Sequence, residues 1–188
     1  ENCQISGIGF QNAHWNYNSA YLPSSIISYR YQKNLLIQKC NFLNIKTISI
    51  NPISDSYYSF QEDTSITLDS LLFDGFTNRP FGFAFIKNVK INNIIVRNSI
   101  SGLDADFWIS TLAFRNNAGP TWRSKVFMTN ILLENCHNSI SNWPSTRIAS
   151  ALQIGTFTDL YISNMTVTNN SSIPSGSPIM FIDWGSSA

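Results

Sequence analysis

The sequence has few charged residues and few of the residues that usually carry chemistry. Only 12% of its 188 residues are charged, and it contains 12 Lys and Arg, 11 Asp and Glu, 2 His and 3 Cys. A net charge of +1 supplies no basic surface, so nucleic acid is not an expected partner. No apolar run is long enough to cross a bilayer as a helix, so membrane insertion is not expected.

Asn, Ser and Ile take the place of the missing charges. The chain has 22 Asn, 26 Ser and 24 Ile, and 13% of its residues are aromatic. Ile and the aromatic residues favour strands, whereas Asn, Ser and Gly favour turns. The composition therefore predicts an all-β protein whose polar surface is built mainly from amides and hydroxyls.

A ten-residue pattern recurs six times along the chain. We call its occurrences copies one to six, and they span residues 3–12, 35–44, 66–75, 89–98, 126–135 and 160–169. Positions one, three, six and eight of the pattern are apolar in all six copies, although only 43% of the whole chain is hydrophobic. At position three the residues are Ile5, Ile37, Leu68, Ile91, Met128 and Ile162. Such period-two positions predict strands with one face turned inward.

The step from position three to position six breaks the alternation and predicts a sharp bend. Position five holds Gly7, Lys39, Ser70, Asn93, Asn130 and Asn164. Position ten, a second predicted bend, holds Asn12, Asn44, Gly75, Asn98, Asn135 and Asn169. Gly and Asn accept a left-handed backbone at low cost. A third strand is predicted before most following copies, at 25–29, 81–85, 110–114, 151–154 and 178–182.

Equivalent residues recurring about every 31 positions predict a solenoid of parallel strands rather than a sandwich of hairpins. The rhythm, clearest in residues 89–98 (VKINNIIVRN), resembles the right-handed parallel β-helix of the pectin-lyase-like superfamily. The resemblance covers nearly the whole chain and implies about six coils with three short strands each. The resemblance says little about function, because that superfamily includes polysaccharide lyases and hydrolases, phage tailspikes, adhesins and coat proteins.

We expect residues 1–188 to form a single β-helix segment. We find no capping element at either end of the sequence, and β-helices are normally capped to prevent end-to-end pairing. The segment is therefore expected to be part of a longer chain or a subunit that associates with itself end to end. The alternative is a fragment whose caps lie outside these residues.

The cysteines occupy different positions of the pattern, so no disulfide within the chain is expected. Cys3 and Cys40 are predicted to be small buried residues, with Cys136 exposed. No paired Cys or His spacing indicates a metal site, and no cofactor is expected.

Sequons at Asn164, Asn169 and Asn170 are candidate glycosylation sites. Asn164 and Asn169 fall at predicted bends, where stacked Asn side chains would occupy their amides, so Asn170 is expected to have the freest amide. The low charge and amide-rich surface favour a secreted or cell-surface protein.

Two functions remain open. The first is a structural or adhesive module that stacks head to tail into a filament. The second is a polysaccharide lyase or hydrolase, or a carbohydrate-binding module, in the long coil 99–125. Its candidate sugar-binding residues are Asp104, Asp106, Trp108, Trp122 and Arg123. We assign no catalytic residue, because the chain lacks the acid motifs of polygalacturonases and the calcium-binding cluster of pectate lyases.

Overall fold

The computed structural model consists of two parallel β-sheets in the part of the chain that it describes. These residues are 2–12, 14–15, 26–29, 33–47, 53–55, 61–76, 81–83, 86–101, 112–114, 124–139, 152–154, 158–173 and 179–181. Among them there is no helix, and every strand pairing is parallel. The prediction of an all-β chain with parallel strands is confirmed.

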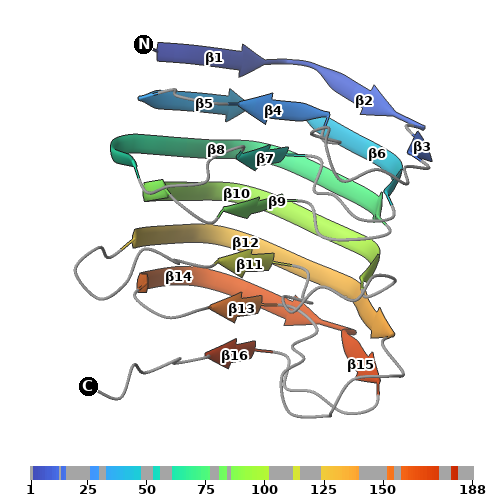
Figure 1. Cartoon of the computed structure of the whole chain (residues 1–188). Helices are drawn as coiled ribbons and strands as arrows, with labels where there is room; N and C mark the ends of the chain where they lie inside the picture. The colour runs from blue at the N-terminus through green and yellow to red at the C-terminus, as the bar shows by residue number, and fades with distance from the viewer. Residues whose placement is uncertain are drawn as a thin grey trace.

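The first sheet contains the repeat copies. Its central order is β1-β5-β8-β10-β12-β14, and β2, β3, β6 and β15 pair beside this path. The strands of this sheet are β1 (Asn2–Ser6), β2 (Gly9–Gln11), β3 (His14–Trp15), β5 (Asn34–Gln38), β6 (Asn41–Thr47), β8 (Gln61–Phe76), β10 (Ile86–Ser101), β12 (Ser124–Ser139), β14 (Thr158–Thr168) and β15 (Ser171–Ile173). Figure 1 shows them stacked in chain order, from β1 at one edge to β14 and β15 near the other.

The strand register follows the predicted alignment of the six copies. Ile37 pairs with Leu68, Leu68 with Ile91, Ile91 with Met128, and Met128 with Ile162. The predicted stack of position-three residues is therefore confirmed. In β8, β10 and β12 the pairing continues beyond the bends, because neighbouring copies bend at the same places. The two short strands expected for each copy are thus joined there into one bent strand.

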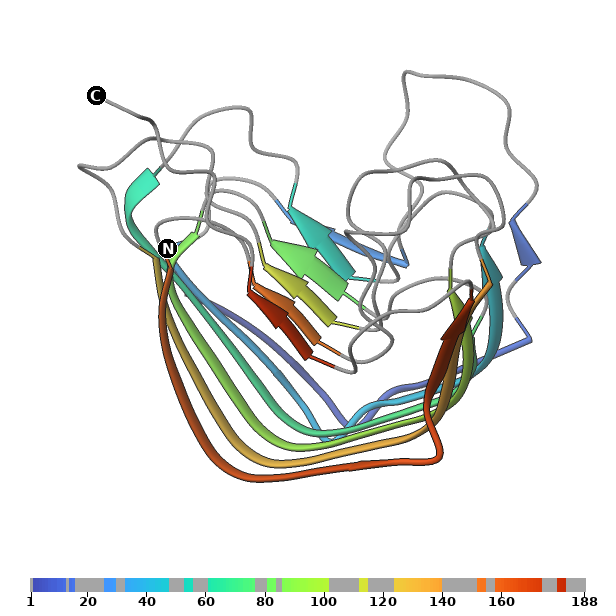
Figure 2. The same ribbon diagram turned by 90° about the horizontal axis from the view of Figure 1, so that it is seen from below.

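The second sheet is built from three-residue strands, each of which follows one of the six copies in the sequence. Its order is β16-β13-β11-β9-β7-β4. The strands are β4 (Ile27–Tyr29), β7 (Ile53–Asp55), β9 (Phe81–Phe83), β11 (Leu112–Phe114), β13 (Leu152–Ile154) and β16 (Ile179–Phe181). Five of them fall in the predicted third-strand segments, whereas β7 was missed because its sequence is short and polar. Figure 2 shows the first sheet bending into a trough, with these strands lying between its two arms.

The core consists of stacked apolar side chains on the inner face of the first sheet. In copies two to five, all residues at positions one, three, six and eight are buried. Phe42 lies between Phe10 and Phe73, with ring centroids 5.0 and 4.8 Å away, so these aromatic rings form one column. Burial of these columns supplies the main hydrophobic stabilisation of the sheet.

The outermost copies bury the same positions only in part. Ile8 in copy one is 44% exposed and Ile162 in copy six is 39% exposed, because among the described strands each of these copies has a neighbour on one side only. For the same reason the prediction that Cys3 is buried is wrong, since Cys3 is exposed. Cys40, in copy two, is buried as predicted.

Candidate functional site: asparagine ladders along the bends

Twelve residues at the two bends of the repeat adopt a left-handed backbone. Positive φ angles between 51 and 77° occur at every residue predicted for positions five and ten. Within the described residues the positive φ angles are confined to these two sets. Asn is favoured here because its short side chain tolerates this conformation and can form local hydrogen bonds. The bends therefore carry Asn side chains from one copy to the next in register.

The first ladder follows position five. The Asn93 Nδ2 donates a hydrogen bond to the Asp69 Oδ1 at 2.9 Å. Asn130 donates to the Asn93 Oδ1 at 2.9 Å, and Asn164 donates to the Asn130 Oδ1 at 2.7 Å. Position five of copy three is Ser70, and the carboxylate of the preceding residue, Asp69, supplies the first acceptor.

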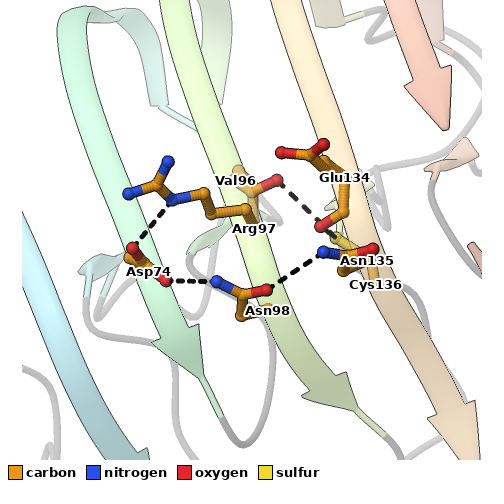
Figure 3. Close-up of polar contacts among 7 residues, drawn as sticks. All are labelled: Asp74, Val96, Arg97, Asn98, Glu134, Asn135 and Cys136. Carbon is orange, nitrogen blue, oxygen red and sulfur yellow. Dashed lines mark hydrogen bonds and ion pairs between the residues drawn. The ribbon is translucent and has the colours of Figure 1, made fainter. Parts of the chain in front are cut away.

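The second ladder follows position ten and has the same construction. The Asn98 Nδ2 donates to the Asp74 Oδ1 at 2.7 Å, and Asn135 donates to the Asn98 Oδ1 at 3.2 Å (Figure 3). Asn169 continues the ladder by donating to the Asn135 Oδ1. In copy three this bend is Gly75, where an added Cβ would lie 3.4 Å from the Asn44 Cα. Gly75 thus interrupts the amide column, and Asp74 starts it again.

Shorter ladders link the first copies. Asn34 donates to the Asn2 Oδ1 and Asn44 donates to the Asn12 Oδ1, both at 2.8 Å. Ser65 then donates its hydroxyl to the Asn34 Oδ1 at 2.6 Å. Hydrogen-bonded side chains thus connect neighbouring copies along much of the first sheet. Such links favour correct register, because a one-residue shift would separate all of these partners.

Asp74 also forms an ion pair with Arg97 on the outer face of the sheet. The Arg97 Nε lies 2.7 Å from the Asp74 Oδ2, and Figure 3 shows the guanidinium extending toward Asp74 and away from Glu134. Partial burial raises the pKa of Asp74, but the hydrogen bonds from Asn98 and Arg97 and the charge of Arg97 outweigh burial. The net pKa of Asp74 therefore lies below its ordinary value.

A further inward column, at position eleven, was missed in the sequence. Ile45, Ser99 and Cys136 follow the second bend in their copies and are fully buried. The prediction that Cys136 is exposed is wrong, because the left-handed residue Asn135 turns the next side chain inward. Polar residues in this column hid its periodicity.

Asn170 occupies the same column in copy six. Its Nδ2 donates to the Leu133 carbonyl at 3.0 Å, and its Oδ1 accepts a hydrogen bond of 2.6 Å from the Cys136 backbone N–H. The expectation that Asn170 has the freest amide of the three sequons is therefore wrong. Asn164 and Asn169 are exposed but engaged in the ladders, as expected from their bend positions.

An aromatic pair on the outer face was also missed. Phe127 and Tyr161 are both at position two, and their rings stack with centroids 4.7 Å apart. They are 37% and 53% exposed. Aligning the outward positions of the repeat would have placed them side by side. Since the rings face one another, each covers one face that a sugar ring could otherwise use.

The predicted sugar-binding residues cannot be placed against these features. Asp104, Asp106, Trp108, Trp122 and Arg123 lie outside the residues that the structure describes. Among the described residues, Gln4, Leu36, Thr67 and Lys90 line a shallow groove of about 660 Å³ beside β1, β5, β8 and β10. The described residues that line it include one cation, Lys90, and no carboxylate.

Metal-binding and membrane-spanning features were sought in the described ranges. No three His, Cys, Asp or Glu side chains gather there to hold a metal ion. No helix in that part of the chain is long and apolar enough to cross a membrane. None of the three cysteines forms a disulfide bond.

Comparison with known proteins gives no assignment. No protein-family model, curated protein or solved structure matches this chain.

Proposed function

We propose that the chain is a right-handed parallel β-helix of six coils, related in architecture to the pectin-lyase-like superfamily. The register between successive copies, the second sheet of short strands and the shared bends support this proposal. The right hand is favoured because nearly all crossovers between parallel strands of one sheet are right-handed.

The proposed function is a structural or adhesive module of a secreted or cell-surface protein. The observation that carries it is the pair of Asn ladders on Asp69 and Asp74, which use the polar side chains of the bends to link one copy to the next. Groups engaged in this way stabilise the stack and are not poised to take up a substrate. The module would therefore act by its length, rigidity and surface.

A glycan on the bend residues is compatible with this role. Asn164 and Asn169 are exposed, and glycosylation at Nδ2 leaves one N–H to donate to the neighbouring copy. Asn170 is less suitable, because both ends of its amide bond the backbone of copy five. Protein secreted from a glycosylating host should lose mass on treatment with an N-glycosidase, and peptide mapping should place the glycan on Asn164 or Asn169.

Incubation with acidic polysaccharides separates the structural function from the enzymatic alternative. We expect purified protein to release no reducing ends and no unsaturated products from polyuronate chains. It should nevertheless unfold in one cooperative transition, because the stacked columns form a continuous core. Cleavage that is lost in Asp104→Ala and Asp106→Ala variants with unchanged circular dichroism would instead assign the chain to polysaccharide-active enzymes.

A further inference from the structure

The amide ladders have a direction. In the part of the chain that the structure describes, each bond between side-chain amides of neighbouring copies has its Nδ2 donor on the later copy and its Oδ1 acceptor on the earlier one. This holds for Asn34 to Asn2, Asn44 to Asn12, Asn130 to Asn93, Asn135 to Asn98, Asn164 to Asn130, and Asn169 to Asn135.

In copies four to six, the carboxylates of copy three fix this direction. The carboxylate oxygens of Asp69 and Asp74 accept hydrogen bonds here, so Asn93 and Asn98 turn their Nδ2 groups toward them. Their Oδ1 atoms then face copy five and can only accept. Each following Asn is oriented by the one before it, up to Asn164 and Asn169 in copy six.

The direction makes the two edges of the first sheet different and complementary. At the β1 edge, Asn12 uses its Oδ1 to accept from Asn44, and its Nδ2 has no partner among the described residues. At the β14 edge, Asn169 uses its Nδ2 as a donor, and its Oδ1 accepts no hydrogen bond from a described residue. One edge thus offers a donor and the other an acceptor at the same position of the repeat.

The apolar columns end at these same edges. Ile8 is 44% exposed in copy one and Ile162 is 39% exposed in copy six, whereas Ile94 in copy four is fully buried. Within the described sheet β1 pairs only with β5, and β14 lies at the other end of the strand order. Exposed strand edges bearing uncovered apolar columns favour pairing with another chain.

We propose that the β14 edge of one molecule binds the β1 edge of a second copy, so that the proteins stack head to tail. This deepens and rests on the proposed structural function. At the joint the Asn12 Nδ2 of the incoming copy donates to the Asn169 Oδ1, and its Ile5 and Ile8 cover Ile162 and Met165. A head-to-head pairing would place two Asn12 donors together and leave no acceptor between them.

The Asn12→Asp variant tests the polar part of the joint. A carboxylate still accepts from Asn44, as Asp74 accepts from Asn98, but it has no donor for Asn169. We expect association, measured by sedimentation velocity, to weaken about tenfold, because a hydrogen bond is lost and two acceptors face each other. Asn41→Asp is the matched control, since Asn41 is exposed, neighbours the same edge and adds the same charge. Equal weakening by the two variants would contradict the ladder continuation.

Two blocked variants test the head-to-tail direction. Ile8→Lys blocks the β1 edge and Ile162→Lys blocks the β14 edge, since lysine on an edge opposes pairing. Both sites are partly exposed, so both variants should fold, and circular dichroism checks this. Each variant alone should be monomeric, whereas an equimolar mixture should form one-to-one dimers through the two unblocked edges.

The possible outcomes distinguish this joint from the proposed function. Dimers of one blocked variant alone would overturn the head-to-tail direction. If the wild-type protein stays monomeric at millimolar concentration, the proposed joint is wrong. If that monomer is folded and has no catalytic activity, the structural function still stands. Polysaccharide cleavage by the wild-type protein would overturn the structural function instead, whatever its state of association.

Discussion

Copies two to five and the two outermost copies have the same sequence pattern but differ in burial. The position-six residue Ile94 is fully buried in copy four, whereas Ile8 at that position in copy one is 44% exposed. At position one, Leu35 in copy two is buried, whereas Cys3 in copy one is exposed. The pattern therefore specifies which way a side chain points, and the neighbouring copies determine how much it is buried.

Stability should consequently be concentrated in the central copies. An internal copy has apolar contacts on both sides, and the Asn bend residues of copies four and five both donate and accept ladder bonds. An outer copy lacks these contacts on one side in the described structure. In a solenoid, stability is close to a sum of repeat and interface contributions, so the same substitution should have different effects in the two regions.

The largest difference is expected in the aromatic column. Phe42→Ala should lower the free energy of unfolding by about 3 to 5 kcal/mol, because the fully buried ring lies between two others. Phe10→Ala removes a partly buried ring at the edge of the same column and should cost about 1 kcal/mol. Urea unfolding of both variants measures this comparison, and equal costs would contradict it.

The next effect concerns the bends. Asn93→Ala should lower the free energy of unfolding by about 2 kcal/mol, because alanine is strained at a φ of 54° and the ladder bonds are lost. Asn93→Gly relieves the strain and loses only the ladder bonds. Thermal unfolding should place Asn93→Gly between Asn93→Ala and wild type. If Asn93→Gly equals wild type, the ladders contribute no measurable stability.

The ion pair of Asp74 should give a smaller, pH-dependent effect. Because its pKa is lowered on folding, the carboxylate stabilises the fold above its unfolded-state pKa of about 4. This stabilisation is lost as the pH falls through the lowered pKa of the folded state. Asp74→Asn should cost about 1 kcal/mol or less at neutral pH, since Arg97 is partly exposed.

An NMR titration of the Asp74 carboxyl provides the direct check. Arg97→Gln should raise this pKa toward its ordinary value but not restore it fully, because the Asn98 hydrogen bond remains. An Asp74 pKa that does not respond to Arg97→Gln would remove the ion pair as a cause.

The smallest perturbation is chemical labelling, which compares the reactivity of the three cysteine thiols. A thiol reagent should label only Cys3 in the folded protein, because Cys40 and Cys136 are buried. All three should react in strong denaturant, and intact-mass spectrometry counts the labels. Rapid labelling of Cys136 under native conditions would contradict the inward column at position eleven.

The sequence predicted the copies, their register and all twelve bends, because apolar periodicity and left-handed residues are local signals. It did not predict the polar members of the inward column, since Ser99 and Asn170 do not look like core residues. Edge exposure was missed for Cys3, because burial depends on neighbours that periodicity alone does not provide. The ladders at Asn164 and Asn169 followed from the bends, whereas their origin at Asp69 and Asp74 required the paired strands.

The central claim is that equivalent apolar residues of successive copies form one stack. Methyl NMR with assigned Ile, Leu and Met signals tests it directly, through contacts between neighbouring methyl groups. We expect contacts from Ile37 to Leu68, from Leu68 to Ile91 and from Ile91 to Met128, and none from Ile37 to Met128. A direct contact between Ile37 and Met128, or missing contacts between neighbours in this series, would contradict the stack.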